Sequence, residues 1–452
     1  MREYCGVSGI ILEDQDLFYK MYLALFSLQH RGQESAGITI NDHGDFETYK
    51  CDGFVRNLLD KRIKSRAGNG SVGHVRYRTS GDSHISNAQP IFAETNFGPI
   101  ALAHNGNLVN FKPLRRHLAA RGAIFSGDSD SELIIHYLAG LKGSFEDALV
   151  ETVKTIKGAY SLVMLTEDAL WAIRDPHGFR PLVYGEIPGG HMVASETCAI
   201  DILDGKVLGE VPAGHILRIG MDGKIEMKSF SSEIIKQHCV FEHIYFARPD
   251  SQVFSKNVHK MRYEMGKQLA REYSHIKADI VVAVPDSGVS SAMGFASESG
   301  IPMDRGLIRN HYVGRSFIQP TQKERMDLVK MKLRPVLEVI EGKEIALIDD
   351  SMVRGTTANA IIKLIKAKNV KKIHYFIASP PIKYSCYFGV DTPDREKLIA
   401  NRMTPEELAE HFGITSVNYL PVEGLKRILK ENANDYCFAC FAGNYIMENE
   451  NG

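Results

Sequence analysis

Two hydrophobic patterns divide the chain. In the first half, short apolar runs between turn residues predict β-strands. Six of these runs lie at Gly6–Leu12, Gly37–Ile40, Ile100–Ala103, Ala159–Leu165, Leu182–Tyr184 and Ile216–Ile219. Two stretches with helical spacing of apolar residues interrupt them, at Leu17–His30 and Asp130–Leu141. The first half is therefore expected to be an α+β unit rich in antiparallel sheet.

The pattern changes after about residue 255, where buried strands alternate with helices. Runs at 279–286 and 344–350 are each followed by Gly or Ser and then by a helical segment. This alternation predicts a parallel α/β unit, with a boundary somewhere between residues 230 and 255. Ligands of open parallel sheets bind at the carboxyl ends of the strands, so the turn after 344–350 is an expected binding site.

Composition narrows the functional class. The 54 Lys and Arg residues nearly balance the 55 Asp and Glu residues, and a net charge of −1 does not suggest a nucleic-acid binder. No apolar run reaches the roughly 18 residues that a membrane span needs, and the first residues show no signal-peptide core. A cytoplasmic, globular enzyme with no nucleic-acid or membrane partner is expected. Seven cysteines, an odd number, favour metal or thiol chemistry over a disulfide framework.

The run Ile345–Thr357 carries the most chemical information. A buried strand ends in two adjacent carboxylates, Asp349 and Asp350, which repel each other unless a cation or hydroxyl groups lie between them. The Gly and Thr residues that follow can form a phosphate cradle at the start of a helix. Mg²⁺ and vicinal ribose hydroxyls would both satisfy the acids. A purely structural interpretation, a capping Asp pair before an N-cap Thr, is less favoured because both features occur together.

This run resembles the ribose-5-phosphate signature of type I phosphoribosyltransferases, which bind phosphoribosyl pyrophosphate (PRPP) with Mg²⁺. The segment Val284–Gly288 is similar to their pyrophosphate loop, and Ile308–Pro320 with Val329–Val336 resembles their flexible closing loop. The resemblance implies Mg²⁺ coordination by Ser287, Asp349 and Asp350. It implies PRPP binding by Asp286, Ser287, Gly288, Lys332, Asp349, Asp350, Ser351, Arg354, Gly355, Thr356 and Thr357.

Near the other end of the chain, Cys5 would become the terminal residue if Met1–Tyr4 were removed. Its α-amino group, with a pKa of about 8, could then accept the proton of a thiol with a pKa of about 8.5. The segments His74–Gly81, His104–Leu108 and Ser129–Glu132 resemble, in order and spacing, the binding elements of N-terminal-nucleophile (Ntn) glutamine amidotransferases. The resemblance implies Cys5 as nucleophile, Asn105 and Gly106 as oxyanion hole, and Arg76 and Asp130 as glutamine ligands.

Four further cysteines suggest a metal centre. Cys437 and Cys440 form a CxxC pair, and with Cys239 and Cys386 they could bind Zn²⁺ or an iron–sulfur cluster, which spacing alone does not distinguish. Their sequence contexts resemble the cluster-containing branch of the glutamine PRPP amidotransferases, which implies a [4Fe–4S] cluster. Downstream in the first half, Arg180 and Glu196 are expected to make structural or interdomain polar contacts.

Together, the resemblances cover nearly the whole chain. They imply a propeptide at 1–4, an α+β Ntn glutaminase domain at 5–235 with antiparallel sheets layered with helices, and an α/β type I phosphoribosyltransferase domain at 236–452 with a parallel sheet and a C-terminal cluster-binding segment. The implied activity is amidophosphoribosyl transfer: ammonia from glutamine displaces pyrophosphate from PRPP in the first committed step of purine synthesis.

The same resemblance implies a homotetramer inhibited by purine nucleotides. Two alternatives stay open at this stage. One is a glucosamine-phosphate synthase type of amidotransferase, against which the Ile345–Thr357 run argues. The other is a non-catalytic regulator that senses PRPP or purine nucleotides.

Overall fold

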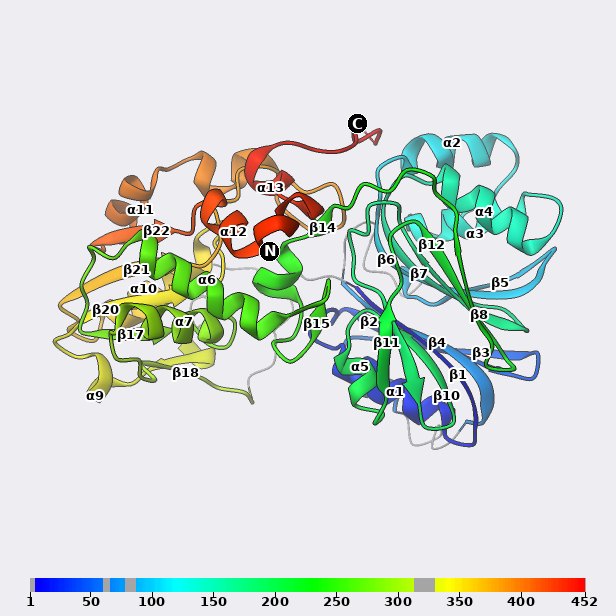
Figure 1. Ribbon diagram of the computed structural model, residues 1–452, viewed down its shortest axis with the longest axis horizontal. Coiled ribbons are helices and arrows are strands. Elements are labelled where there is room, and N and C mark those ends of the chain that lie inside the picture. Colours follow the sequence, from blue (N-terminus) through cyan, green and yellow to red (C-terminus); the bar gives the residue numbers. More distant parts are fainter. Residues whose placement is uncertain (1–4, 60–65, 78–86, 313–329, 452) are drawn as a thin grey trace.

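The structure is a computed structural model that describes residues 5–59, 66–77, 87–312 and 330–451 (Figure 1). The N-terminal half forms one lobe and the C-terminal half the other, and the end of the chain runs back from the second lobe towards α2 (Phe111–Ala120). Within the described residues, no helix is both long and apolar enough to cross a lipid bilayer.

The N-terminal half contains two antiparallel sheets. The first has the strand order β11-β9-β10-β1-β4-β2-β3 and the second the order β13-β12-β8-β7-β6-β5, counted over the described residues. The strands of the first sheet are β1 (Gly6–Asp14), β2 (Ser35–Asp42), β3 (Asp45–Asp52), β4 (Gly68–Arg76), β9 (Val183–Ile187), β10 (Gly190–Ala194) and β11 (Lys206–Glu210). Those of the second are β5 (Ile91–Thr95), β6 (Gly98–Leu108), β7 (Gly158–Leu165), β8 (Ala169–Arg174), β12 (His215–Gly220) and β13 (Ile225–Ser229).

The two sheets face each other across an apolar layer that includes Val7, Val72, Val163 and Leu217. Helices α1 (Leu17–Ser27) and α5 (Cys198–Asp201) cover the outer face of the first sheet. Helices α3 (Asp130–Ala139) and α4 (Phe145–Thr155) cover the second. This α-β-β-α layering arises because each sheet is apolar on both faces and must bury both.

The C-terminal half is built on a parallel sheet of order β17-β20-β21-β22. Its strands are β17 (Ile280–Ala283), β20 (Glu344–Asp349), β21 (Lys372–Ile377) and β22 (Ser416–Tyr419). Helices α6 (Val258–Glu272), α7 (Val289–Ser299) and α12 (Val422–Leu429) pack on one face. Helices α10 (Thr356–Lys366) and α11 (Pro405–Phe412) pack on the other. All paired strands of the sheet run parallel, so their carboxyl ends share one edge.

Short elements complete the chain. They are β14 (His238–Cys239), the π-helical turn η3 (Glu242–Phe246), β15 (Gln252–Val253), β16 (Lys256–Asn257), β18 (Leu307–Arg309), β19 (Leu333–Pro335), α9 (Leu337–Ile340), β23 (Tyr436–Cys437) and α13 (Ala439–Ala442). The 3₁₀ turns are η1 (Val55–Leu58), η4 (Arg395–Lys397), η5 (Ile399–Asn401) and η6 (Lys430–Asp435).

The expected fold class is confirmed: antiparallel sheets layered with helices, followed by a parallel α/β unit. Every expected strand and helix occurs, usually a few residues longer or shorter than expected. The six predicted runs did not include β3, β4, β5, β8, β10, β11 or β13, and in β4 glycines weaken the strand signal. Its Gly73 packs so closely under α1 that a Cβ atom would lie 2.6 Å from the Met21 sulfur. This glycine therefore serves close packing of helix on sheet.

Candidate functional site

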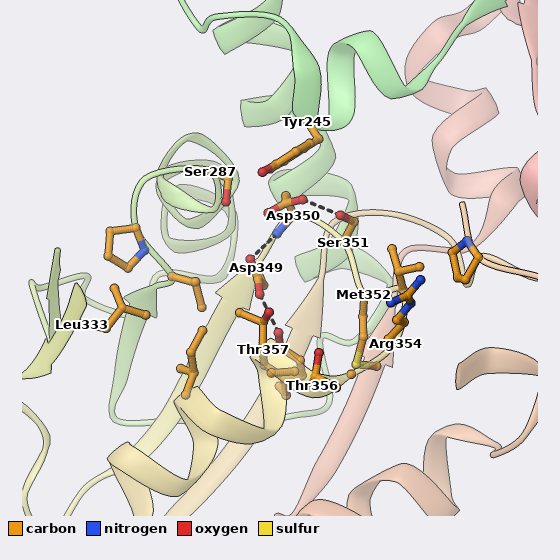
Figure 2. Close-up of a pocket in the computed structure, with 18 of the residues that line it drawn as sticks. Tyr245, Ser287, Leu333, Asp349, Asp350, Ser351, Met352, Arg354, Thr356 and Thr357 are labelled. Carbon is orange, nitrogen blue, oxygen red and sulfur yellow. Dashed lines mark hydrogen bonds between the residues drawn. The ribbon is translucent and has the colours of Figure 1, made fainter. Parts of the chain in front are cut away.

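A cavity of about 360 Å³ opens at the carboxyl edge of the parallel sheet (Figure 2). Most of its lining comes from the loop after β17, from the end of β20 and from the loop and first turns of α10. The expected residues among the lining are Ser287, Asp349, Asp350, Ser351, Arg354, Gly355, Thr356 and Thr357. Residues distant in sequence are thus brought together where parallel sheets bind ligands.

The acidic pair is held by hydrogen bonds on one side of this cavity. Asp349 accepts a hydrogen bond from the Tyr375 hydroxyl at 2.6 Å and another from the backbone N–H of Asp350 at 2.9 Å. The Ser351 hydroxyl donates to Asp350 at 2.5 Å. Burial and, next, the charge of Asp350 raise the pKa of Asp349 well above its usual value. Two nearly buried carboxylates with this repulsion are suited to a bound cation, which would relieve it.

The loop from Ser351 to Gly355 delivers the start of α10 to the cavity. Gly355 adopts a left-handed conformation, with φ of 70°, immediately before Thr356. A Cβ atom there would also lie 2.4 Å from Ile399, so both the backbone and the packing require glycine. The first N–H groups of α10 and the two Thr residues consequently face a site where a phosphate would be stabilised.

Three expected PRPP ligands lie beside the cavity instead of lining it. Asp286 accepts a 2.6 Å hydrogen bond from Arg309. Gly288 packs against β20, where a Cβ atom would lie 2.5 Å from the Ile348 carbonyl oxygen. Lys332 precedes Leu333, which does line the cavity. Most of the expected closing loop, 313–329, lies outside the described residues.

Cys5 lies at the start of β1 in the N-terminal half and is 5% exposed. β1 pairs with β4, so Gly6 faces Val75 and Cys5 lies beside Arg76 and Tyr77. The thiol donates to the Tyr77 carbonyl oxygen at 3.4 Å. Burial raises the pKa of Cys5 to about 11, while Tyr77 and Arg76 oppose the change and Asp130 adds to it. In this chain, with residues 1–4 attached, the thiol stays protonated and needs a base to react.

Asp130 is the first residue of α3, which Ser129 caps. It accepts a hydrogen bond from the Leu108 N–H at 3.1 Å and lies 3.6 Å from Nδ1 of His104. Burial alone would raise the pKa of Asp130, but His104 and the Leu108 N–H outweigh it and lower that pKa. The carboxylate is therefore held in its charged form, which suits an ammonium group.

Asn105 and Gly106 follow His104 on β6. Both polar atoms of the Asn105 side chain are buried with no hydrogen-bond partner among the described residues. Such atoms are costly unless a ligand uses them. Gly106 has φ of 158°, and a Cβ atom there would lie 1.9 Å from the Ala159 carbonyl oxygen. The structure thus gathers the expected residues Cys5, Arg76, Asp130, Asn105 and Gly106 around one end of β1, β4 and β6.

The four predicted metal-binding cysteines lie in one region at the junction of the two halves. The pairing of β14 with β23 sets Cys239 opposite Cys437. The Cys440 carbonyl oxygen accepts hydrogen bonds from Lys383 and Tyr384, shortly before Cys386. Burial, reinforced by the other cysteines, raises the pKa of Cys437 to about 12. Within the described residues no three His, Cys, Asp or Glu side chains converge closely enough to hold a single metal ion.

A segment of the C-terminal half reaches the end of β6. The Asn107 amide donates to the Tyr387 carbonyl oxygen at 2.8 Å, and Arg180 donates to that of Phe388. Gly389 packs against Gly106, where an added Cβ atom would lie 3.1 Å from the Gly106 carbonyl carbon. The segment that follows Cys386 therefore contacts Asn107 and the expected oxyanion-hole residue Gly106 directly. Arg180 and Glu196 make the expected interdomain polar contacts. Arg180 does so by its bond to Phe388, and Glu196 accepts a hydrogen bond from the Ser251 hydroxyl at 2.7 Å.

Comparison with known proteins decides the family. A glutamine amidotransferase domain family matches residues 74–201, and a phosphoribosyl transferase domain family matches residues 256–380. The chain is 45% identical over 451 residues to amidophosphoribosyltransferase 1 of Arabidopsis thaliana chloroplasts, covering 99% of this chain and 79% of that protein. The chain belongs to the amidophosphoribosyltransferase family.

Two further likenesses extend over whole chains. The amidophosphoribosyltransferase of Archaeoglobus fulgidus is 44% identical, covering 98% of this chain and 97% of that protein. The solved structure of the glutamine PRPP amidotransferase of B. subtilis, complexed with ADP and GMP, superposes with a TM-score of 0.91 at 39% identity and covers 98% of both chains.

As an amidophosphoribosyltransferase, this chain transfers ammonia from glutamine to PRPP and releases 5-phosphoribosylamine, glutamate and pyrophosphate, the first step of purine synthesis. The predicted family, fold and enzyme class are confirmed. The glucosamine-phosphate synthase and sensor alternatives receive no support from these relatives.

Sequence reasoning missed several residues of both sites. His104 stands within one of the glutaminase motifs, but its contact with Asp130 was not expected. Tyr375 lies on a strand whose pattern is that of plain core, and the Asp349 contact depends on pairing between strands. Arg31 is buried and contacts the Cys5 backbone. A charged residue directly after the apolar stretch at Leu17–His30 was the available signal.

Proposed function

We propose that Cys5 is the glutaminase nucleophile. Arg76 binds the glutamine α-carboxylate, Asp130 binds its α-ammonium group, and Asn105 with the Gly106 N–H stabilises the oxyanion. Two observations carry this proposal: Arg76 and Asp130 both influence the Cys5 thiol, and the Asn105 side chain keeps two buried polar atoms with no partner among the described residues. Preorganised donors of this kind typically contribute about 3 kcal/mol each to transition-state stabilisation.

The base in this proposal is the α-amino group of Cys5, released when residues 1–4 are removed. Support comes from the raised pKa of the buried thiol, which calls for an adjacent base. The propeptide itself lies outside the described residues. We place the domain limits at 5–235 and 236–452, in the stretch between the end of β13 at Ser229 and the start of β14 at His238.

The phosphoribosyl site is proposed to take PRPP with Mg²⁺. The repulsion between Asp349 and Asp350 fits a divalent cation, and Mg²⁺ commonly binds one or two carboxylates together with substrate phosphates. Ser287 would add a hydroxyl ligand. When bound, the ion supplies charge neutralisation for the pyrophosphate leaving group. The start of α10, with Ser351, Arg354, Gly355, Thr356 and Thr357, would hold the ribose 5-phosphate, and Asp286, Gly288 and Lys332 would flank the pyrophosphate.

Cys239, Cys386, Cys437 and Cys440 are proposed to hold a [4Fe–4S] cluster. The four irons of a cluster take one thiolate each, so its ligands stand farther apart than those around one tetrahedral Zn²⁺. Cys437, Cys386 and Cys239 all act electrostatically on Cys440, so the four thiols share one region, which supports a common metal group. Their burial fits thiolates compensated by a cationic cluster. Its role here would be structural or oxygen-sensitive control.

The proposal also covers inhibition, oligomeric state and location in the cell. Purine nucleotides would act as inhibitors, since a relative was solved with ADP and GMP. A homotetramer would cover the exposed aromatic row on α1, where Tyr19 is 46% and Phe26 is 54% exposed and Tyr22 stacks with both. A cytoplasmic location would suit seven cysteines, all within the described residues, that form no disulfide.

The test separates the two half-reactions. Cys5→Ala should abolish glutamine-dependent synthesis and leave ammonia-dependent synthesis largely intact, whereas Asp349→Asn with Asp350→Asn should impair both. Cys51→Ala, a half-buried cysteine away from the site, is the matched control. Mass measurement of active protein should show loss of residues 1–4. Full glutamine-dependent activity in Cys5→Ala, or with residues 1–4 retained, would contradict the assignment.

A further inference from the structure

A glutamine side chain extends the hydrogen bonding of β5 towards the proposed oxyanion hole. β5 begins at Ile91, which pairs with Leu102 of β6. Two residues farther along β6, the backbone N–H of His104 donates to the side-chain oxygen of Gln89 at 2.6 Å. His104 is followed directly by Asn105. The Gln89 side chain therefore holds the β6 backbone at the point where this strand enters the glutaminase site.

The carbonyl oxygen of His104 is also held by a side chain. It lies 3.1 Å from Nε2 of His74 on β4. Because a carbonyl oxygen only accepts, Nε2 carries the hydrogen of this bond. Burial lowers the pKa of His74 to about 3, so the ring is neutral near pH 7. The peptide group that joins His104 to Asn105 is thus fixed through its oxygen, and the preceding one through its N–H.

The amide nitrogen of Gln89 reaches the element that carries the proposed ammonium ligand. It donates to the hydroxyl oxygen of Ser131 at 2.9 Å. Ser131 follows Asp130 in the first turn of α3, and its hydroxyl donates to the carboxylate of Asp130 at 3.5 Å. The same hydroxyl oxygen lies 3.1 Å from Nδ1 of His104. One planar amide therefore connects the backbone of β6 with the start of α3.

Burial makes this connection specific. Gln89 is 4% exposed, His104 is 2% exposed and Ser131 is fully buried. A backbone N–H can only donate, so the amide oxygen of Gln89 has to face His104 and its nitrogen has to face Ser131. A buried polar group that loses its partner is strongly disfavoured. The amide consequently has one orientation and one pair of partners.

We propose that Gln89 is a positioning residue for glutamine cleavage. Its amide fixes the distance between Asn105 and Gly106, which would stabilise the oxyanion, and Asp130, which would bind the substrate ammonium group. Glutamine has to contact both elements while its amide carbon lies next to Cys5. A misplacement of about 1 Å can lower such a rate about 100-fold. This inference rests on the proposed function of the glutaminase site.

Two full-length variants separate the two hydrogen bonds of the amide. Gln89→Met keeps the length of the side chain but removes both bonds, whereas Ser131→Ala removes the α3 partner and leaves the bond to His104. Gln268→Met is the matched control, because Gln268 is a buried glutamine on α6, in the C-terminal half, whose amide donates to Glu272 at 2.7 Å. Kinetics with glutamine give kcat and KM, and ammonia-dependent synthesis reports on the PRPP site.

A further measurement is the alkylation of Cys5 by iodoacetamide, followed by mass spectrometry. This small reagent reacts with the thiolate and requires neither the oxyanion donors nor Asp130. Its rate therefore reports on the thiol and its base. Slow glutamine cleavage with a normal alkylation rate indicates misplaced binding elements, whereas general damage to the fold changes both rates.

We expect Gln89→Met to lower kcat for glutamine about 100-fold and to raise KM. Ser131→Ala should raise the KM for glutamine about fivefold, as for the loss of one hydrogen bond, with kcat within about twofold of the wild type. Because both substitutions break the same connection, their effects on KM should not multiply in the double variant. Alkylation of Cys5, ammonia-dependent synthesis and the kinetics of the control should stay within about twofold of the wild type. If Gln89→Met does not fold, the smaller Ser131→Ala decides.

Two results would overturn the inference alone. One is an unchanged KM in Ser131→Ala or an unchanged kcat in folded Gln89→Met. The other is a fall in glutamine turnover that slower alkylation of Cys5 or slower ammonia-dependent synthesis matches. Wild-type protein that still cleaves glutamine after complete alkylation of Cys5 would instead contradict the proposed nucleophile, and this inference with it.

Discussion

The hydroxyl of Tyr375 donates a 2.6 Å hydrogen bond to Oδ2 of Asp349. The two residues lie on neighbouring parallel strands, where Asp349 pairs with Ile377. This bond stabilises the charged carboxylate, while burial and the Asp350 charge act against it and win. The fold therefore holds the Asp349 carboxyl in place but disfavours its charged form. A bound cation would stabilise that charged form.

The first prediction concerns pH. The pKa of Asp349 is raised above its ordinary value of 3.8 in the folded protein. A group with a raised folded pKa contributes stability that is complete below the unfolded pKa and is lost as pH rises through the folded pKa. A tenfold change in the proton affinity of one group corresponds to about 1.4 kcal/mol. We expect metal-free protein to lose stability as pH rises from about 3.8, the ordinary pKa, to the raised pKa of folded Asp349. Mg²⁺ should restore more stability at the upper end of this pH range than at the lower end.

The measurement is urea unfolding with and without Mg²⁺ across this pH window. Asp349→Asn removes the titrating carboxyl, so the difference between wild type and variant isolates its contribution from that of other groups. An identical pH dependence in both proteins would contradict the raised pKa. An effect of Mg²⁺ that survives in Asp349→Asn together with Asp350→Asn would show that the ion binds elsewhere.

The second prediction concerns the oxyanion hole. Asn105→Ala removes a buried side chain whose two polar atoms have no partner in the described part of the chain. We expect glutamine turnover to fall by about 10²–10³-fold, the usual cost of losing one oxyanion donor. Ammonia-dependent synthesis should not follow, because that site is separate. Asn96→Ala, on an exposed turn where the amide donates to Leu141, is the control. Equal loss of both activities would indicate a damaged fold instead.

The sequence predicted individual strands and helix starts better than the contacts between residues that lie far apart in sequence. Hydrophobic spacing located the strand that ends at Asp349 and the helix that follows Gly355, because a buried strand and a helix N-terminus have local signals. The helical spacing over Asp130–Leu141 likewise located the start of α3 at Asp130. These residues interact mainly with near neighbours in sequence.

Contacts across long separations had no such signal. Arg31 and Glu242 lie 211 residues apart, and Tyr375 lies 26 residues from Asp349. Hydrophobic spacing predicts which residues share one face of a single helix or strand. The contacts in these pairs depend instead on how different strands, and the two halves of the chain, pack against each other. The grouping of the four cysteines likewise came from family resemblance and not from their positions along the chain.

The third prediction tests the proposed cluster. Burial raises the pKa of Cys386 to about 11. Arg180 lowers this pKa and Cys239 raises it further, each by less than burial does. Thiols with raised pKa values become ligands only when a metal compensates their charge. Cys437→Ser should lose iron, sulfide and a brown visible absorption, and it should unfold at a lower temperature. Cys51→Ser should keep all three. Wild-type protein that is colourless and loaded with zinc would contradict the cluster.

The last prediction concerns the C-terminal segment. Asn451 donates to the Leu108 carbonyl oxygen at 2.8 Å and accepts from the Lys112 N–H at 2.9 Å, while the Glu450 N–H donates to Val109. The Leu108 N–H is the group that holds Asp130. The C-terminal segment therefore contacts the residue of β6 whose N–H holds a proposed glutamine ligand.

Deleting residues 449–452 removes two hydrogen bonds of the Asn451 side chain and one backbone hydrogen bond of Glu450, each worth about 1 kcal/mol. We expect the KM for glutamine to rise several-fold with little change in ammonia-dependent synthesis. The ion pair of Lys157 with Glu450 belongs to the same contact but is exposed, so Lys157→Ala should have little effect. A deletion variant with an unchanged KM would show that β6 holds Asp130 without help, and a loss as large in Lys157→Ala would assign the effect to charge instead.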